Sequence, residues 1–246
     1  MSANTPPELA VVVPVMNEEE NLAPLIAEIT AALDGGAPYE IVYVDDGSDD
    51  STPRLLKDLL GTTPTLRVIR HEKRSGQSTA VRTGVKAARA PVIATLDGDG
   101  QNDPADIPTL VARLKEATDP DFLIVAGHRV KRKDTAYYRW QSRQANKIRA
   151  GLLKDDTPDT GCGLKVFTRT AFLDLPYFDH MHRYLPALMI RRGGAVVSVP
   201  VNHRARERGT SKYGMWNRLW VGIVDLMGVM WLQRRAKVTG STEING

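Results

Sequence analysis

The chain has 246 residues, of which 42% are hydrophobic, a length that fits one large α/β domain or one domain with a small appendage. A net charge of +4, from 33 basic and 29 acidic residues, does not mark a nucleic-acid-binding protein, and we predict none as a partner. The single cysteine, Cys162, excludes a disulfide framework and a zinc site built from cysteines.

Apolar runs alternate with segments of helical period through the first half of the chain. This alternation, with strands so apolar, predicts a mostly parallel sheet covered on both faces by helices. The predicted strands are 9–15, 40–44, 66–70, 92–96 and 122–126. The helical segments are 22–33, one that begins at Thr52-Pro53, and 104–116.

The second half of the chain is less regular. It predicts, in order, a basic helix at about 135–153, a glycine-rich turn at 159–164, a strand at 195–201, an amphipathic helix at about 215–233 and a loose tail. The N-terminus has neither the basic nor the apolar region of a signal peptide, and the apolar segment 219–232 is interrupted by Asp225. We therefore expect a cytoplasmic protein, peripheral at the inner face of the cell membrane.

Closely spaced acids follow the fourth predicted strand, in the stretch ATLDGDGQNDP at 94–104. Two such carboxylates repel by ~4 kcal/mol at 4 Å near a protein surface, and a bound cation reverses that penalty. No dinucleotide-binding or P-loop glycine motif is present to hold phosphates. The hard oxygens of Asp97, Asp99 and Gln101 therefore predict a site for Mg²⁺ or Mn²⁺.

Other interpretations of this stretch are weaker. An EF-hand loop is rejected because Asn102 and Pro108 occupy its glycine and glutamate positions. A hairpin turn conflicts with the helical segment that follows, and a solvated loop accounts only for Asp103, as a helix cap. Polar residues also follow the other predicted strands, at 14–18, 45–48 and 127–129, on what would be one edge of the sheet. Of the second group we expect Asp46 to contact a ligand.

Four segments, in this order and spacing, resemble the nucleotide-sugar-binding half of family 2 glycosyltransferases: VVVPVMNEEENL, IVYVDDGSDDST, GQSTAVRTGVKAA and VIATLDGDGQNDP. The segments GHR, DTGCGLKVFTR and HRARERGTSKYG extend the resemblance to dolichol-phosphate mannosyltransferases and bacterial polyprenyl-phosphate glycosyltransferases. The resemblance covers about 9–214. It implies a GT-A-type domain at 1–214, with a donor-binding half at 9–127 and an acceptor half at 128–214, and an appended helix and tail at 215–246.

The resemblance also implies roles for individual residues. Asp97, Asp99 and Gln101 would hold the metal on the donor diphosphate. The catalytic residues would be Asp97, Asp99, Arg129 and Arg208. The donor would be bound by Pro14, Asn17, Glu18, Asp46, Gln77, Asp97, Ser211 and Lys212, and the acceptor by Arg129, Arg139 and Arg143. The turn at 160–163, with Leu164 and Lys165 after it, departs from the family's Ser-Gly-Phe-Arg pattern, which leaves sugar or acceptor contacts near 160–165 open.

Two helical segments have alternative interpretations. The stretch 129–154 holds nine basic residues and one acid, and Arg139, Arg143 and Lys147 share a helix face. That face fits an anionic lipid phosphate, or it is simply solvated. The C-terminal helix is either a core or dimer helix, or an interfacial helix with tryptophans at the headgroup level. His71, His180 and His182 show no ligand spacing and are expected to be surface or packing residues.

These features predict an inverting, metal-dependent glycosyltransferase that moves a sugar from a UDP- or GDP-linked donor to a polyprenyl phosphate. One alternative is a family 2 enzyme that glycosylates a hydroxyl, for which Asp159 would be the base. The second is a non-catalytic protein that binds nucleotide sugars. The sequence leaves the sugar, the acceptor and any homo-oligomer open.

Overall fold

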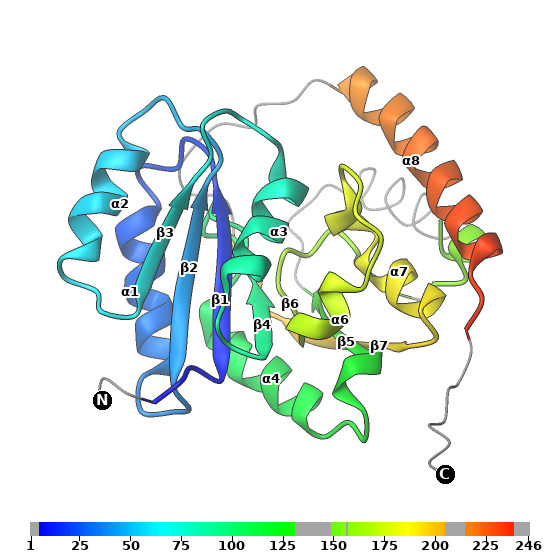
Figure 1. The fold of residues 1–246 in the computed structure, drawn as a ribbon, viewed down its shortest axis with the longest axis horizontal. Coiled ribbons are helices and arrows are strands. Elements are labelled where there is room, and N and C mark those ends of the chain that lie inside the picture. The colour runs from blue at the N-terminus through cyan, green and yellow to red at the C-terminus, as the bar shows by residue number, and fades with distance from the viewer. Residues whose placement is uncertain (1–4, 131–148, 156, 205–214, 239–246) are drawn as a thin grey trace, which may run out of the picture.

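Seven strands form one sheet at the centre of the described chain, which comprises residues 5–130, 149–155, 157–204 and 215–238 of the computed structural model (Figure 1). Their order across the sheet is β3-β2-β1-β4-β6-β5-β7. All neighbours are parallel except the two pairs made by β6, so the prediction of a mostly parallel sheet is correct. The strands are β1 (Leu9–Val15), β2 (Tyr39–Asp45), β3 (Leu66–Arg70), β4 (Val92–Thr95), β5 (Leu123–Arg129), β6 (Lys165–Thr168) and β7 (Ala195–Val201).

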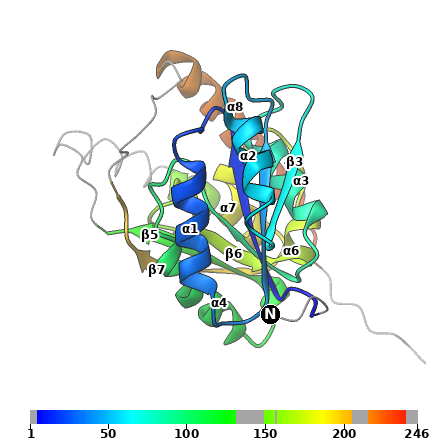
Figure 2. The ribbon, with the colours of Figure 1, turned by 90° about the vertical axis from the view of Figure 1, so that its left-hand side faces the viewer.

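Helices cover both faces of the sheet because successive side chains of each strand point to opposite sides. In β1, Val11 and Val13 join the apolar cluster under α1 (Leu22–Leu33), α2 (Thr52–Leu60) and α4 (Ile107–Lys115). Ala10 and Val12 join the cluster under α3 (Gln77–Ala87), α6 (Arg169–Leu173) and α7 (Leu185–Arg191). Figure 2 shows α1 and α3 on opposite sides of the sheet.

Most predicted elements are found close to their expected bounds. Strands β1, β3 and β7 have the predicted ends, and α8 (Met215–Arg235) extends the predicted C-terminal helix by two residues. One correction concerns 127–129, which we expected after the fifth strand but which form its last three residues. Asp103 caps the segment that begins at Pro104, as predicted, because its carboxylate accepts a hydrogen bond from the Ala105 amide at 3.0 Å.

Strand β6 was not predicted, and it determines the geometry of the sheet edge. It lies antiparallel between β4 and β5, with Lys165 opposite Thr95 and Ala126. The Thr95 hydroxyl also donates to the Gly163 carbonyl at 2.8 Å. The glycine turn, residues 159–164, is thereby held at the carboxyl end of β4, directly beside the predicted acidic site.

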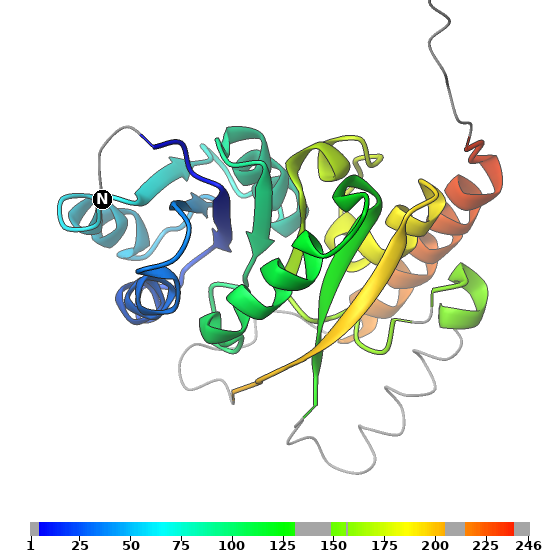
Figure 3. The ribbon, with the colours of Figure 1, turned by 90° about the horizontal axis from the view of Figure 1, so that it is seen from below.

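Helix α8 lies against α7 at the side of the molecule away from β1–β3 (Figures 1 and 3). Val229 of α8 is fully buried in the apolar cluster under α7, and this contact anchors α8. The other side of α8 exposes Val224, Met227 and Trp231. Among the described helices, none combines the length and the apolar character that a membrane crossing needs.

Candidate functional site

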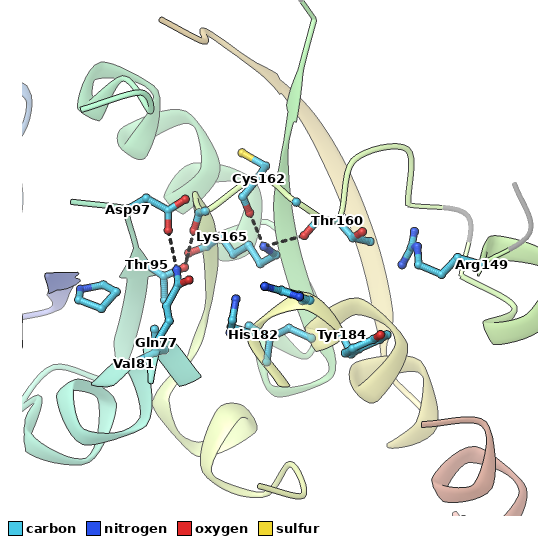
Figure 4. Close-up of a pocket in the computed structure, with 15 residues that line it drawn as sticks. Gln77, Val81, Thr95, Asp97, Arg149, Thr160, Cys162, Lys165, His182 and Tyr184 are labelled. Carbon is cyan, nitrogen blue, oxygen red and sulfur yellow. Dashed lines mark hydrogen bonds between the residues drawn. The ribbon is translucent and has the colours of Figure 1, made fainter. Parts of the chain in front are cut away.

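A cavity of about 360 Å³ opens at the carboxyl end of β4 (Figure 4). Its volume falls at the lower end of the range typical of small-molecule sites. The walls come from the sheet edge, α3, the glycine turn and the segment before α7. They are lined by Pro14, Gln77, Val81, Thr95, Asp97, Arg149, Thr160, Gly161, Cys162, Gly163, Lys165, His182, Arg183, Tyr184 and Leu185.

Asp97 lies two residues beyond the carboxyl end of β4 and faces this cavity. Its Oδ1 accepts a hydrogen bond from Gln77 Nε2 at 2.9 Å. Burial, followed by the negative charge of Asp99, raises the pKa of Asp97 to about 6, against the opposing effects of Lys165 and Arg129. A partly buried carboxylate beside a second acid is stabilised in its ionised form by a bound cation.

The donor set fits Mg²⁺ or Mn²⁺ bound together with a diphosphate. Within the described ranges no three histidine, cysteine, aspartate or glutamate side chains gather into a metal-binding group. Mg²⁺ in phosphate-binding sites uses only one or two carboxylates and takes its other ligands from phosphate and water. Asp99 and Gln101 share one loop, in which the Gln101 amide donates to Asp99 Oδ1 at 3.1 Å.

The glycine turn is pressed against Asp97 and is held there by a buried lysine. Lys165 Nζ donates to the carbonyls of Thr160, at 3.3 Å, and Cys162. Desolvation lowers the pKa of Lys165. A Cβ atom at Gly163 would lie 2.2 Å from Asp97 Oδ2, so only glycine leaves room for the carboxylate. This contact gives the unusual turn sequence a physical reason, and the turn does line the cavity.

Arg129 and Asp159 form a largely buried bidentate pair beside the glycine turn. Arg129 Nε lies 2.6 Å from Asp159 Oδ2, and Nη2 lies 2.8 Å from Oδ1. The hydrogen bonds to Asp159 are the main reason that the pKa of Arg129 is raised. A carboxylate whose two oxygens both accept hydrogen bonds from a guanidinium is poorly placed to act as a general base.

The residues expected around the nucleotide connect the loops that follow β1 and β2. Asn17 adopts a positive φ of +55°, and its side chain exchanges hydrogen bonds with Asp49. Asp46 accepts from the amides of Ser75 and Gly76, both at 2.8 Å, and contacts His71 Nδ1 at 2.7 Å. Asp46 therefore positions the segment that leads into α3. Neither Asn17 nor Asp46 lines the described cavity.

Glu18 takes part in the same loop region. Its backbone amide donates to Thr52 Oγ1 at 3.0 Å, and its Oε2 accepts from Asn21 Nδ2 at 2.7 Å. Like Asn17, it is absent from the cavity lining. Five further predicted site residues lie outside the described part of the chain: Arg139, Arg143, Arg208, Ser211 and Lys212.

Several lining residues were not predicted from the sequence. Arg149 belongs to the basic run noted above but was not singled out, and its Nη1 pairs with Asp155 Oδ2 at 2.7 Å. Lys165 lies in the stretch 160–165, where the sequence left sugar or acceptor contacts open, whereas Arg183 and Tyr184 were not singled out. His182 was expected to be a surface or packing residue, and the structure corrects this expectation because His182 lines the cavity.

Asp97→Asn is expected to stabilise the metal-free fold at pH 7.5 but not at pH 3.5. The native pKa of about 6 exceeds the ordinary 3.8, so the fold favours the protonated acid. The contribution of the protonated Asp97 carboxyl to stability is complete below pH 3.8 and is lost as the pH rises through 6. Over that range the free energy of unfolding falls by about 3 kcal/mol. Urea unfolding in EDTA at both pH values measures the difference, with exposed Asp58→Asn as the control. Equal stabilisation at both pH values would contradict the expectation.

Comparison with known proteins agrees with this geometry. The family model "Glycosyl transferase family 2" matches residues 10–175. The dodecaprenyl-phosphate galacturonate synthase of Rhizobium johnstonii is 36% identical over 92% of the chain, which spans 68% of that relative. An undecaprenyl-phosphate 4-deoxy-4-formamido-L-arabinose transferase of Edwardsiella ictaluri is 33% identical over 84% of the chain, which spans only 63% of it, under two thirds.

Solved structures share the fold. The UDP complex of glucosyl-3-phosphoglycerate synthase from Mycobacterium tuberculosis superposes with a TM-score of 0.69 at 20% identity, over 96% of this chain and 82% of that one. The complex of the same enzyme with Mg²⁺ and UDP gives a TM-score of 0.66 at 18% identity, over 96% and 81%. The predictions of a GT-A-type α/β fold and of a glycosyltransferase are confirmed. The chain belongs to glycosyl transferase family 2.

Proposed function

We propose that the protein transfers a sugar from a nucleoside-diphosphate donor to a polyprenyl phosphate, with inversion at the anomeric carbon. The charge of the cavity supports this most directly. Among the described residues, its lining contains one carboxylate, Asp97, and three cations, Arg149, Lys165 and Arg183. A phosphate acceptor is already ionised near neutral pH and needs no base, whereas a hydroxyl acceptor does. The names of the relatives, which act on dodecaprenyl and undecaprenyl phosphates, point the same way.

In this proposal Asp97 and Asp99 hold Mg²⁺ or Mn²⁺ on the donor diphosphate, with Gln101 beside them. When bound, the metal supplies positive charge as a Lewis acid at the leaving diphosphate. Arg208, Ser211 and Lys212 are assigned to the donor side on sequence resemblance. Single in-line displacement at the anomeric carbon produces inversion.

The acceptor side is assigned to the basic residues of the second half. Asp159 fixes the guanidinium of Arg129 by its two hydrogen bonds, so that Arg129 is oriented before a substrate arrives. Arg139 and Arg143 are proposed to attract the lipid phosphate. The hydroxyl-acceptor alternative is less favoured because its base, Asp159, is engaged by Arg129.

The experiment is a donor panel with purified protein, undecaprenyl phosphate in detergent, and Mg²⁺ or Mn²⁺. UDP-glucose, UDP-galacturonate, UDP-N-acetylglucosamine and GDP-mannose are assayed for release of the nucleoside diphosphate. We expect release from one donor that requires both the metal and the polyprenyl phosphate. Release only with a hydroxylated acceptor would support the alternative with Asp159 as base. Binding of nucleotide sugars without any release would indicate a non-catalytic protein.

We also propose that the protein is peripheral at the inner face of the membrane and that the exposed side of α8 contacts the lipid surface. Val224, Met227 and Trp231 share one face of the helix and are 49%, 56% and 59% exposed. Arg234 and Arg235 follow in the last turn, where they favour an anionic surface.

Replacing this apolar face should weaken membrane binding without affecting the site. The double substitution Met227→Ser with Trp231→Ser is expected to reduce partitioning onto vesicles of phosphatidylglycerol and phosphatidylethanolamine by about tenfold or more. Vesicle flotation measures this, and Leu60→Ser on α2 is the matched exposed control. Unchanged flotation of the double variant would mean that α8 instead covers another protein surface.

A further inference from the structure

His182 has an unusual set of contacts for a side chain that lines the cavity. It lies in the turn Met181–Arg183 before α7, and it lines the same cavity as Gln77 and Lys165 (Figure 4). Its Nδ1 lies 2.7 Å from the hydroxyl of Ser78 on α3. The same hydroxyl oxygen accepts a hydrogen bond from the backbone amide of His182 at 3.2 Å. Ser78 is itself buried, with 1% of its surface exposed.

These contacts determine which ring nitrogen of His182 carries the proton. A serine hydroxyl has one hydrogen to donate, and a buried hydroxyl normally donates it. Within the described chain, the acceptor that Ser78 Oγ can reach is His182 Nδ1, at 2.7 Å. Ser78 therefore donates to Nδ1, and the proton of the neutral ring resides on Nε2. The backbone of residue 182 and the serine hydroxyl together hold the imidazole in this state.

The ring also stays uncharged. Desolvation, with smaller effects from the charges of Arg183 and Lys165, lowers the pKa of His182 to about 3. Beside the basic side chains of Arg149, Lys165 and Arg183, the cavity thus holds a neutral imidazole whose ring proton has a fixed position. Cations suit phosphate oxygens, whereas a neutral donor suits an uncharged oxygen such as a hydroxyl. Three other neutral donors of the described lining, Gln77, Thr95 and Tyr184, donate within the protein, to Asp97, the Gly163 carbonyl and the Gly222 carbonyl. His182 adds an N–H whose place on the ring is set by Ser78.

We propose that His182 binds the donor sugar, by donating a hydrogen bond from Nε2 to one of the sugar's hydroxyl oxygens, and that Ser78 fixes the required tautomer. The inference rests on the proposed function, because it places the sugar of a nucleotide donor in this cavity. His182 is then a residue that selects among sugars, since a donor that lacks a hydroxyl at this point would leave the N–H unpaired.

The first test needs no substrate. Nitrogen-15 NMR of the histidine side chains reports tautomer and charge directly, with His182→Asn used to assign the signal. We expect His182 to show a protonated Nε2 and an unprotonated Nδ1, with no change between pH 5 and 8. In Ser78→Ala this preference should weaken. A charged ring, or a proton on Nδ1 in the wild-type protein, would overturn the proposal.

The second test distinguishes the role of the His182 Nε2–H group from that of the contact between His182 Nδ1 and Ser78. The amide of glutamine reaches the position of histidine Nε2, and the amide of asparagine reaches that of Nδ1. Calorimetry with Mg²⁺ compares UDP and GDP with UDP-glucose, UDP-galacturonate and GDP-mannose, and gives the affinity that each sugar adds to its diphosphate. We expect this gain to fall about tenfold in His182→Asn, to stay within about threefold in His182→Gln, and affinity for the bare diphosphates to be unchanged.

Each other outcome counts against the inference. Equal loss in both variants would indicate packing, and weaker binding of the bare diphosphates would place His182 beside phosphate. No gain from any sugar in the wild-type protein would remove the sugar from this cavity. The proposed function fails separately, in the transfer assay, because neither NMR nor calorimetry depends on turnover.

Discussion

Asp97→Asn is expected to lower kcat for sugar transfer by ~10²–10³-fold while the protein remains folded. The substitution keeps the shape of the side chain but removes the charge that would hold the metal at the leaving diphosphate. Steady-state release of nucleoside diphosphate measures the loss, and circular dichroism follows the fold. The gain in stability expected for the same variant above pH 6 makes misfolding a poor explanation for lost activity.

Asp103→Asn is the matched control in the same loop. Its side chain caps the Pro104 turn and contacts Arg204 at 2.8 Å, so it should retain its structural role as an amide with activity within about threefold of wild type. Equal activity of Asp97→Asn and the wild-type protein would show that Asp97 does not act in transfer.

Gly163→Ala is expected to lower kcat by about 10²-fold through displacement of Asp97. The added methyl would lie 2.2 Å from Asp97 Oδ2, and the turn cannot retreat easily because Thr95 holds the Gly163 carbonyl and Lys165 holds the turn. The carboxylate must therefore rotate away from its position near Gln77, and misplacement on this scale costs about two orders of magnitude.

Gly151→Ala is the matched control for that substitution. A Cβ atom at Gly151 meets nothing within 4 Å, and the residue lies in a helical stretch, so alanine should be tolerated. Metal affinity, followed by Mn²⁺ electron paramagnetic resonance, should fall in Gly163→Ala and stay unchanged in Gly151→Ala. Normal Mn²⁺ binding and activity in Gly163→Ala would show that the turn adapts to the methyl.

The parallel strands were predictable because each is a run of four to seven mostly apolar residues between turn or cap signals, as in β1. The acidic pair was predictable for a related reason, since Asp97 and Asp99 interrupt such a run abruptly. Strand β6 was not, because it begins with a lysine and holds only two apolar residues, Val166 and Phe167. A short segment with a charged end carries no periodic signal.

The cationic side of the cavity depends on contacts that local sequence does not contain. Lys165 can be buried because two backbone carbonyls of the glycine turn accept hydrogen bonds from its ammonium group, whereas sequence alone places lysine at the surface. His182 and Ser78 are 104 residues apart along the chain and meet only when α3 and the turn before α7 pack together. Motif spacing indicated the donor side of the site, whereas tertiary packing creates the opposite wall.

The position of β6 in the sheet also has a consequence for synthesis of the chain. β4 and β5 are complete by Arg129, but they do not pair with each other, and the strand that joins them ends only at Thr168. Until the ribosome has released that segment, both strands present unpaired edges of apolar sequence, which are sites of aggregation. Nascent chains in which β6 is still inside the ribosome should therefore need chaperones, whereas chains from which both β6 and β7, the second neighbour of β5, have emerged should become protease-resistant.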